Sequence, residues 1–252
     1  MPNLEWNHNI WNEKYNWDNL GEEWSDKFGG SEAQWFGSIL PRIHRFLPAK
    51  NTLEISPGFG RWTNYLLNNT ENYVGVDLSA KCINHCINRF SKYNNAKFYV
   101  NDGMSLDMIE DGIFDFIFSF DSLVHANLEV HKSYIPQIIS KLSSGGFAFV
   151  HHSNFIDSGA PAILEGQLTP HSRGEDVGAT IYSEIVKQSG GQIILQEVIN
   201  WGEQNVVDYT IDALTIFSKK NTNTNPIFIE NKQFHLEKKY IRDVQSFYSK
   251  IN

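Results

Sequence analysis

A pair of glycines and a later aspartate form the part of this chain with the clearest chemistry. Gly58 and Gly60 follow one short apolar run, and Asp77 ends the next. A glycine has no Cβ, so a turn built on it can take positive φ and a ligand can lie against its backbone. A carboxylate at the end of a parallel strand can accept hydrogen bonds from both hydroxyls of a ribose. The pattern predicts a site for an adenosine-bearing cofactor.

The spacing around these glycines indicates which cofactor. A dinucleotide site requires G-x-G-x-x-G with a pyrophosphate on the helix N-terminus, and the third position here is Thr63. An acidic residue on the first strand, followed by G-x-G, suits a ligand with a positive sulfonium and an amino acid head. Glu54 supplies that acid, so the spacing favours S-adenosylmethionine.

Protic side chains follow the run that ends at Phe120. Asp121 and His125 are spaced so that one helical turn would point both into the same cleft. Histidine titrates near neutral pH and can remove the proton of an acceptor hydroxyl, while Asp121 orients the imidazole or the acceptor. The alternative for His125 is a histidine at a helix start with its hydrogen bonds satisfied.

A third polar cluster consists of two adjacent histidines, a serine and Asn154. Neighbouring side chains on a strand point to opposite faces, and we expect His152, the one nearer the carboxyl end, to face the cleft. Together with Asp121 and His125 it would form the ligand set of an alternative, metal-dependent site. The following stretch, 155–177, is rich in turn-forming residues and is expected to be a functional loop. The candidates for binding the acceptor are Arg61, Asn154 and Arg173. Arg173, or Arg61 in its place, would hold an anionic group of the acceptor, a phosphate or carboxylate, through its planar fork.

Apolar runs that alternate with helical segments must position these residues. Their alternation predicts an α/β fold whose parallel sheet has right-handed crossovers. Two closing runs follow a helical segment at 180–189, which gives a doubly wound, Rossmann-like sheet of seven strands. The predicted strands are 52–55, 73–76, 97–100, 113–120, 147–151, 192–198 and 210–217.

From about Trp24 to Phe217 the chain resembles a class I S-adenosylmethionine-dependent methyltransferase. The resemblance rests on LEISPGFGRW at 53–62, VGVDLS at 74–79, SFDSLVH at 119–125 and HHSN at 151–154. These strings are similar to a bacterial subgroup associated with capsule and O-antigen modification, although many members have a glycine in place of Ser56. The resemblance makes the two closing strands an antiparallel hairpin at one edge. It implies cofactor contacts at Glu54, Pro57, Gly58, Gly60, Trp62, Asp77, Leu78, Asp102, Gly103, Met104, Ser119 and Phe120.

Bulk properties suit an enzyme of one α/β domain with short extensions. The 252 residues carry a formal net charge of -8 and no run of lysine and arginine, which argues against a nucleic acid acceptor. No apolar stretch is long enough to cross a bilayer, and no signal sequence begins the chain, so a cytoplasmic protein is expected. The two cysteines, Cys82 and Cys86, are expected to be buried on one helix without a metal.

The two ends lie outside the predicted core, which we place at residues 46–218. Residues 1–45 hold five of the seven tryptophans, and these rings either pack the extension onto the domain or form a lid over the cofactor. Residues 219–252 are read as a polar linker and an amphipathic helix from Phe234 to Ile251. That helix would pack on the domain or on a second subunit in a homodimer.

These features favour an O-methyltransferase that acts on a sugar or another small polar precursor of a surface glycan. The acceptor could be phosphorylated, nucleotide-linked or of phosphoramidate type. An N-methyltransferase of an amino sugar or small amine is the alternative on the same fold. A partner subunit that binds adenosine without catalysis is the alternative from another class.

Overall fold

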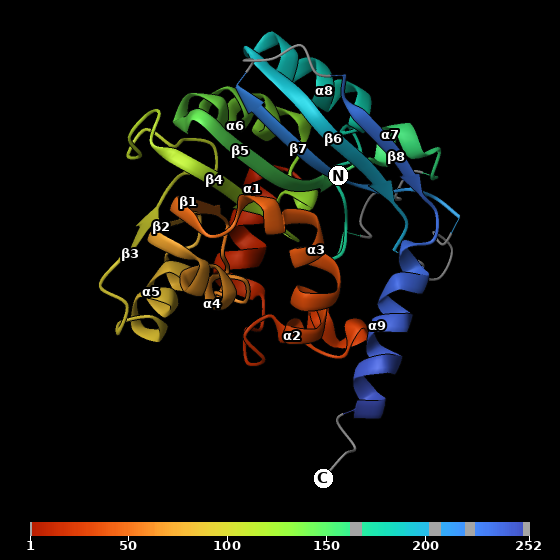
Figure 1. Cartoon of the computed structure of the whole chain (residues 1–252), viewed down its shortest axis with the longest axis horizontal. Helices are drawn as coiled ribbons and strands as arrows, with labels where there is room; N and C mark the ends of the chain where they lie inside the picture. The colour runs from red at the N-terminus through yellow and green to blue at the C-terminus, as the bar shows by residue number, and fades with distance from the viewer. Residues whose placement is uncertain (1, 162–167, 202–207, 220–224, 249–252) are drawn as a thin grey trace.

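The computed structural model describes residues 2–161, 168–201, 208–219 and 225–248. The described part of the chain folds around one eight-stranded sheet in the order β3-β2-β1-β4-β5-β7-β6-β8, with helices on both faces (Figure 1). The strands are β1 (Ala49–Ile55), β2 (Thr70–Asp77), β3 (Ala96–Val100), β4 (Phe114–Ser119), β5 (Leu142–Ser153), β6 (Gly191–Ile199), β7 (Asp212–Lys219) and β8 (Ile227–Asn231).

The strand pairing confirms a Rossmann-like α/β fold and corrects the number of strands. Only β7 runs antiparallel to its neighbours β5 and β6, and the other pairings are parallel. The predicted hairpin of β6 and β7 is present, but the edge strand is β8, which pairs with β6. The sequence interpretation placed β8 in the C-terminal extension, because this strand is five residues long and exposed along most of its length, without the alternation that marks a half-buried strand.

Two apolar layers cover the sheet, and alternate strand residues point into one or the other. On one face Ile117, Ala148 and Val150 pack against α6 (Leu128–Lys141) and α8 (Ala179–Gln188). On the other face Phe118 and Phe149 pack against the N-terminal segment and the helices α4 (Thr63–Leu66) and α5 (Ala80–Arg89). Cys82 and Cys86 of α5 are buried, as predicted, and do not form a disulfide. The remaining elements are η5 (Leu67–Asn69), η6 (Leu123–His125) and α7 (Phe155–Ser158).

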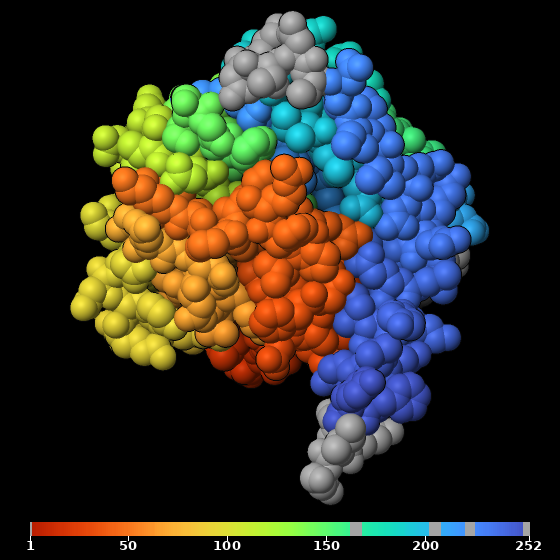
Figure 2. All heavy atoms as spheres, viewed as in Figure 1, coloured from red at the N-terminus to blue at the C-terminus, as the bar shows by residue number. Residues whose placement is uncertain are grey.

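Residues 4–46 contain a series of short helices that occupy much of one side of the molecule, between the yellow and blue parts of the chain (Figure 2). Arg42 ties this segment to the end of the chain, since its guanidinium forms ion pairs with Glu197 of β6 and Glu237 of α9 (Phe234–Tyr248). The helix α9 therefore packs on its own chain. The N-terminal helices are α1 (Leu4–His8), η1 (Asn9–Lys14), η2 (Glu22–Phe28), α2 (Ser31–Gln34), η3 (Trp35–Ile39), α3 (Leu40–Ile43) and η4 (His44–Phe46).

Some predictions fall partly outside the described residues. Most of the linker proposed at 219–225 and the last residues of the C-terminal helix lie there, as does part of the loop at 155–177. A search of the described helices finds none that combines the length and the apolar character needed to cross a membrane.

Candidate functional site

A cavity lies at the carboxyl edge of β1, β2 and β4, beneath the N-terminal segment. Most of its floor comes from the loops that follow these strands, where open α/β sheets bind their ligands. The floor of the cavity includes Ser56, Pro57, Gly58, Phe59, Arg61, Trp62, Asp77, Leu78, Cys82, Gly103, Phe120, Asp121, Ser122, Leu123 and His125. The opposite side of the cavity consists of Leu4, Asn7, Trp11, Trp17, Leu20, Gly21 and Trp24.

The turn after β1 and the aspartate after β2 are joined by hydrogen bonds. The Gly58 N–H donates to Asp77 Oδ2 at 3.0 Å, and the Ser79 N–H donates to Asp77 Oδ1 at 2.8 Å. Gly58 has φ of 58°, the left-handed region that glycine allows. Burial raises the pKa of Asp77 to about 6. The cavity therefore has a bare backbone beside a carboxylate fixed in position.

Ser56 occupies the position where many similar proteins have glycine, and it adopts the conformation that glycine favours. Its φ is 59°, which is unusual for a residue with a side chain. The Ser122 hydroxyl donates to the Ser56 carbonyl at 2.8 Å and so joins the turns after β1 and β4. Ser56 thus takes part in the turn through its backbone, in a conformation that glycine adopts without strain.

We call residues 4–24 the roof, because their side chains close the cavity opposite the strand ends. Trp17 stacks on Phe59 of the cofactor turn with ring centroids 4.7 Å apart. Trp11 and Trp24 pack edge to face, 5.7 Å apart, and Trp11 also lies 5.4 Å from the His125 ring. The aromatic rings of the N-terminal segment therefore face the cavity as well as packing the segment onto the domain.

Asp121 lines the cavity in a strained backbone conformation. Its φ is 61°, outside the usual range for a residue with a side chain. Its Oδ2 lies 2.7 Å from Arg61 Nη2, and this ion pair holds the pKa of Asp121 below its usual value against the effect of burial. Arg61 in turn donates to the Ser25 hydroxyl and lies over the Trp62 ring. The loop after β4, the cofactor turn and the N-terminal segment thus meet at one guanidinium.

His125 lines the same cavity and is held in one neutral form. Its Nδ1 lies 2.7 Å from the Ser172 carbonyl, which can only accept, so Nδ1 carries the proton and Nε2 carries the lone pair. Burial, with a further effect from the Arg173 charge, lowers the pKa of His125 to about 3. The imidazole is therefore uncharged at neutral pH.

The cavity brings together only part of the predicted cofactor set. Glu54 does not reach it, because Oε2 accepts hydrogen bonds from Thr63 and Tyr73 beneath the turn, and burial raises its pKa to about 7. Asp102 uses Oδ1 to accept the N–H groups of Met104 and Ser105 in its own turn. Predicted residues that line the cavity are Pro57, Gly58, Trp62, Asp77, Leu78, Gly103 and Phe120, whereas Glu54, Gly60, Asp102, Met104 and Ser119 do not.

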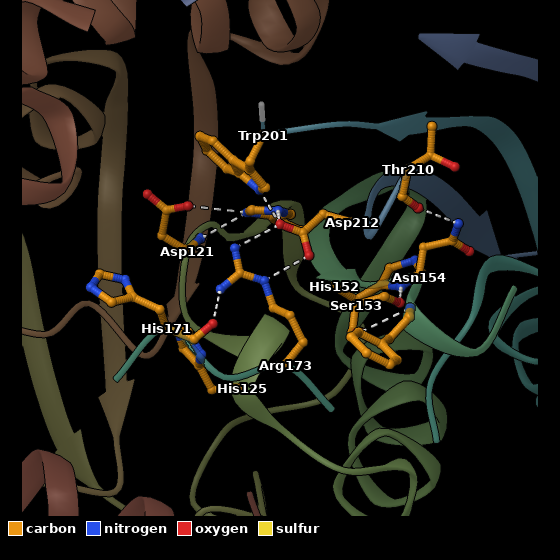
Figure 3. Close-up of polar contacts among 12 residues, drawn as sticks. Asp121, His125, His152, Ser153, Asn154, His171, Arg173, Trp201, Thr210 and Asp212 are labelled. Carbon is orange, nitrogen blue, oxygen red and sulfur yellow. Dashed lines mark hydrogen bonds and ion pairs between the residues drawn. The ribbon is translucent and has the colours of Figure 1, made fainter. Parts of the chain in front are cut away.

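The prediction that His152 faces the cleft is wrong. His152 points toward α8, where its ring stacks on Tyr182 and its Nε2 lies 2.8 Å from the Thr215 hydroxyl. Asn154 also points away, since its side chain donates to the Thr210 carbonyl and accepts the first N–H of α8. His151 takes the other face of β5. Figure 3 shows His152, Ser153, Asn154 and Thr210 in one group, and Asp121, Trp201, Asp212 and Arg173 in another.

Arg173 was predicted to bind an anionic acceptor, but the structure pairs it with a buried carboxylate. Both Nε and Nη2 donate to Asp212, at 2.8 and 2.9 Å, in the two-pronged geometry that arginine forms with carboxylates (Figure 3). Asp212 also accepts from the Trp201 indole. Sequence reasoning missed Asp212 and Trp201, and no local motif marks either residue.

The alternative metal ligand set is not assembled, because His152 lies on the opposite face from Asp121 and His125. No group of three or more histidine, cysteine, aspartate or glutamate residues in the described ranges could hold a metal ion. We therefore expect a chelator to leave the turnover of the enzyme unchanged. Turnover measured before and after EDTA checks this, and activity that is lost and then restored by magnesium or manganese would contradict it.

Comparison with known proteins gives the chemistry of the domain. Residues 52–146 match the family model described as a methyltransferase domain. These residues are therefore similar to a methyltransferase domain, and they include the turn and the aspartate from which the sequence predicts an S-adenosylmethionine site. The chain is 32% identical over 125 residues to phosphoethanolamine N-methyltransferase 1 of Triticum aestivum, a match that covers 47% of this chain and 25% of the relative. The chain thus spans about a quarter of the length of that relative.

Solved structures match the chain over most of its length. The PH0226 protein from Pyrococcus horikoshii OT3 has a TM-score of 0.59 at 18% identity, and the match covers 84% of this chain and 96% of that one. DhpI in its complex with SAH has a TM-score of 0.56 at 15% identity, and the match covers 86% and 96%. At these identities the likeness shows the fold alone. The narrower capsule subgroup gains no support from the matches.

The residues of the cavity fit the cofactor of such a domain. At Gly58 and Gly103 a side chain would collide with Trp17 and Leu4 of the roof, so at both positions the roof packs directly against bare backbone. Between them Asp77 presents a carboxylate that can accept ribose hydroxyls. When bound, the cofactor supplies an electrophilic methyl group on a positive sulfur. The cofactor contacts of the individual residues remain predictions.

Proposed function

We propose that this chain is an S-adenosylmethionine-dependent methyltransferase that transfers a methyl group to a hydroxyl oxygen of a small, neutral, polar acceptor, such as a sugar used for a capsule or another surface glycan. The observation that carries the proposal is the fixed form of His125. Its Nδ1 proton is committed to the Ser172 carbonyl, so Nε2 can accept a hydrogen bond from an acceptor hydroxyl. An oxygen held in this way keeps a lone pair for attack.

The charges around the cavity support a neutral acceptor. The guanidinium groups of Arg61 and Arg173 are already paired with Asp121 and Asp212. A phosphate would have to compete with a buried carboxylate for either arginine, at a large cost in unpaired charge. The indole rings of the roof, in contrast, offer flat apolar faces on which a sugar ring can stack.

Positioning contributes more to this reaction than proton removal. Holding two reactants in line supplies roughly 7–11 kcal/mol, whereas a general base contributes a factor of about 10² to 10⁴. In the proposed mechanism Asp77 and the backbone of Gly58 hold the donor, and His125 with Asp121 orients the acceptor hydroxyl. Residues 1–45 act as the lid that excludes water when both ligands are bound.

Methylation of nitrogen is the second candidate, because the relative from Triticum aestivum is named as an N-methyltransferase. Labelled S-adenosylmethionine, incubated with neutral sugars, nucleotide-linked sugars, sugar phosphates, amino sugars and phosphoethanolamine, tests both candidates. Mass spectrometry of the products then locates the added methyl group. We expect it on oxygen of an uncharged sugar group, and methylation of nitrogen alone would overturn the proposal.

Replacing His125 by alanine should lower kcat about 100-fold, within the range for removal of a positioned proton acceptor. Cofactor affinity should stay nearly unchanged, because His125 acts on the acceptor. Steady-state kinetics and calorimetry measure the two effects. His44→Ala is the matched control, since the exposed His44 also places Nδ1 3.0 Å from a carbonyl, that of Pro41, but lies outside the cavity. Full activity of His125→Ala would remove this residue from the mechanism.

A further inference from the structure

His151 is completely buried between two aspartates on the side of β5 opposite His152. Its Nδ1 lies 3.3 Å from Asp121 Oδ1, and its Nε2 lies 3.3 Å from Asp212 Oδ2. One of these carboxylates lines the cavity, and the other belongs to β7. Antiparallel pairing of β5 with β7 places Ser153 opposite Asp212, which brings this carboxylate next to His151.

These groups belong to a longer series of alternating charges. It runs from Arg61 through Asp121, His151 and Asp212 to Arg173, and every neighbouring pair lies within 3.3 Å. The two arginines and the two aspartates balance one another, so the imidazole is the only member whose charge varies near neutral pH. The series connects the cavity to the loop that carries Ser172, the partner of His125.

The Nδ1 atom of His151 has two contacts that exclude each other. It lies 3.2 Å from the backbone nitrogen of Asp121 and 3.3 Å from the Oδ1 atom of the same residue. An unprotonated Nδ1 can accept the backbone N–H, whereas a protonated Nδ1 can only donate to the carboxylate. The protonation of one atom thus decides which part of Asp121 is held.

We propose that His151 is a positioning residue for methyl transfer and that its charged form orients the Asp121 carboxylate toward the acceptor. The inference rests on the proposed function, because Asp121 is taken to act on the acceptor. The strained backbone of Asp121, with φ of 61°, needs such a restraint. His151 touches neither ligand and acts through Asp121 alone.

The groups around His151 determine how its charge changes with pH. Burial alone would lower the pKa of His151, but the two aspartates beside its ring nitrogens outweigh burial and raise the pKa above its usual value. The charged form therefore persists to higher pH than in a free imidazole, and it is lost as the pH rises through this raised pKa. The charged groups around His151 are Asp121 with its partner Arg61 and Asp212 with its partner Arg173, and the rings of Phe120 and Trp201 pack beside it. The adjacent His152 points to the other face of β5.

His151→Phe keeps a ring but removes both nitrogens, and His151→Asn restores a donor near the position of Nδ1. We expect His151→Phe to lower kcat about 100-fold, the effect of a small misplacement of a reacting group, with little change in cofactor affinity. His151→Asn should recover most of that loss. The wild-type kcat should fall at alkaline pH, and this fall should be absent in His151→Asn, which cannot titrate.

His152→Phe is the matched control, because it makes the same change at the next position of β5 but on the other face. It should change kcat no more than a few-fold. Equal kcat in wild type and His151→Phe, or an alkaline fall that persists in His151→Asn, would overturn the inference. If His151→Phe does not fold, the pH profile of His151→Asn decides.

A measurement without an acceptor separates this inference from the proposed function. The ring nitrogens of His151 can be followed by NMR in wild type and in Asp121→Asn. The pKa of His151 should be lower in Asp121→Asn, because one of its two carboxylates is removed, and an unchanged pKa would overturn the inference. Wild-type enzyme that methylates no hydroxyl would instead overturn the proposed function.

Discussion

Replacing Asp77 by alanine should reduce the affinity for S-adenosylmethionine by about 10² to 10⁴. Each hydrogen bond to a charged group contributes roughly 1.5–3 kcal/mol, and a ribose offers two hydroxyls to this carboxylate. The substitution also removes the acceptor of two backbone hydrogen bonds, because the N–H groups of Gly58 and Ser79 donate to the Asp77 carboxylate in the wild type. Titration calorimetry of the purified protein measures the change directly.

Asp115→Ala is the matched control for this variant. Asp115 also accepts a backbone N–H, that of Asn51, but it lies near the amino end of β4, at the opposite edge of the sheet. Its loss should leave cofactor affinity unaltered. Unchanged affinity in Asp77→Ala would remove Asp77 from the cofactor site.

The same carboxylate gives cofactor binding a pH dependence. Burial raises the pKa of Asp77 to about 6, so the charged form predominates above that pH and is lost as the pH falls through it. Affinity should therefore be constant above about pH 7 and should decline below pH 6. Asp77→Asn should lack this decline.

Replacing Arg61 by methionine should have the largest effect on stability. The guanidinium is only 5% exposed and is the closer of the two basic groups beside Asp121, at 2.7 Å against 3.3 Å for His151, so its removal takes the main counter-charge from a largely buried carboxylate. Breaking a buried pair in this way costs about 3–5 kcal/mol of unfolding free energy. A protein of this size should then melt roughly 6–20 °C lower. Thermal denaturation measures the shift, and turnover should fall with it because Asp121 loses its orientation.

Lys232→Met is the matched control, because it removes an ion pair that is exposed to solvent. Lys232 and Glu230 are both more than half exposed, and such pairs contribute about 0–1 kcal/mol. Its melting temperature should stay close to that of the wild type. If Arg61→Met melts no lower than Lys232→Met, the pair with Asp121 does not stabilise the fold.

The proximity of Gly58 and Asp77 was predictable because its signals are local. Gly58 follows β1 and Asp77 ends the neighbouring β2, and the geometry of one strand-turn-helix-strand unit brings them together. The series around His151 depends on pairing between distant strands. Asp212 reaches His151 only through the antiparallel register of β5 and β7, which no local pattern specifies.

The choice between the two histidines failed for a related reason. Alternation correctly assigns His151 and His152 to opposite faces, but it does not say which face is the cleft. The position of the cleft depends on which segments pack on each face of the sheet. The N-terminal segment packs on the face to which Phe149 points, and His151, two residues later, points to the same face. The helical and strand periodicity of the sequence predicted the elements of the core. It did not predict β8, because the side chains of this strand are mostly exposed.

The roof contributes no strand to the sheet, and its contacts join residues far apart in the chain. The Asn7 side chain donates to the His125 carbonyl, 118 positions later. A segment held only by contacts of this kind can detach while the core stays folded. Circular dichroism would then report an intact protein, whereas the fluorescence of Trp11, Trp17 and Trp24 would report that the cavity had opened.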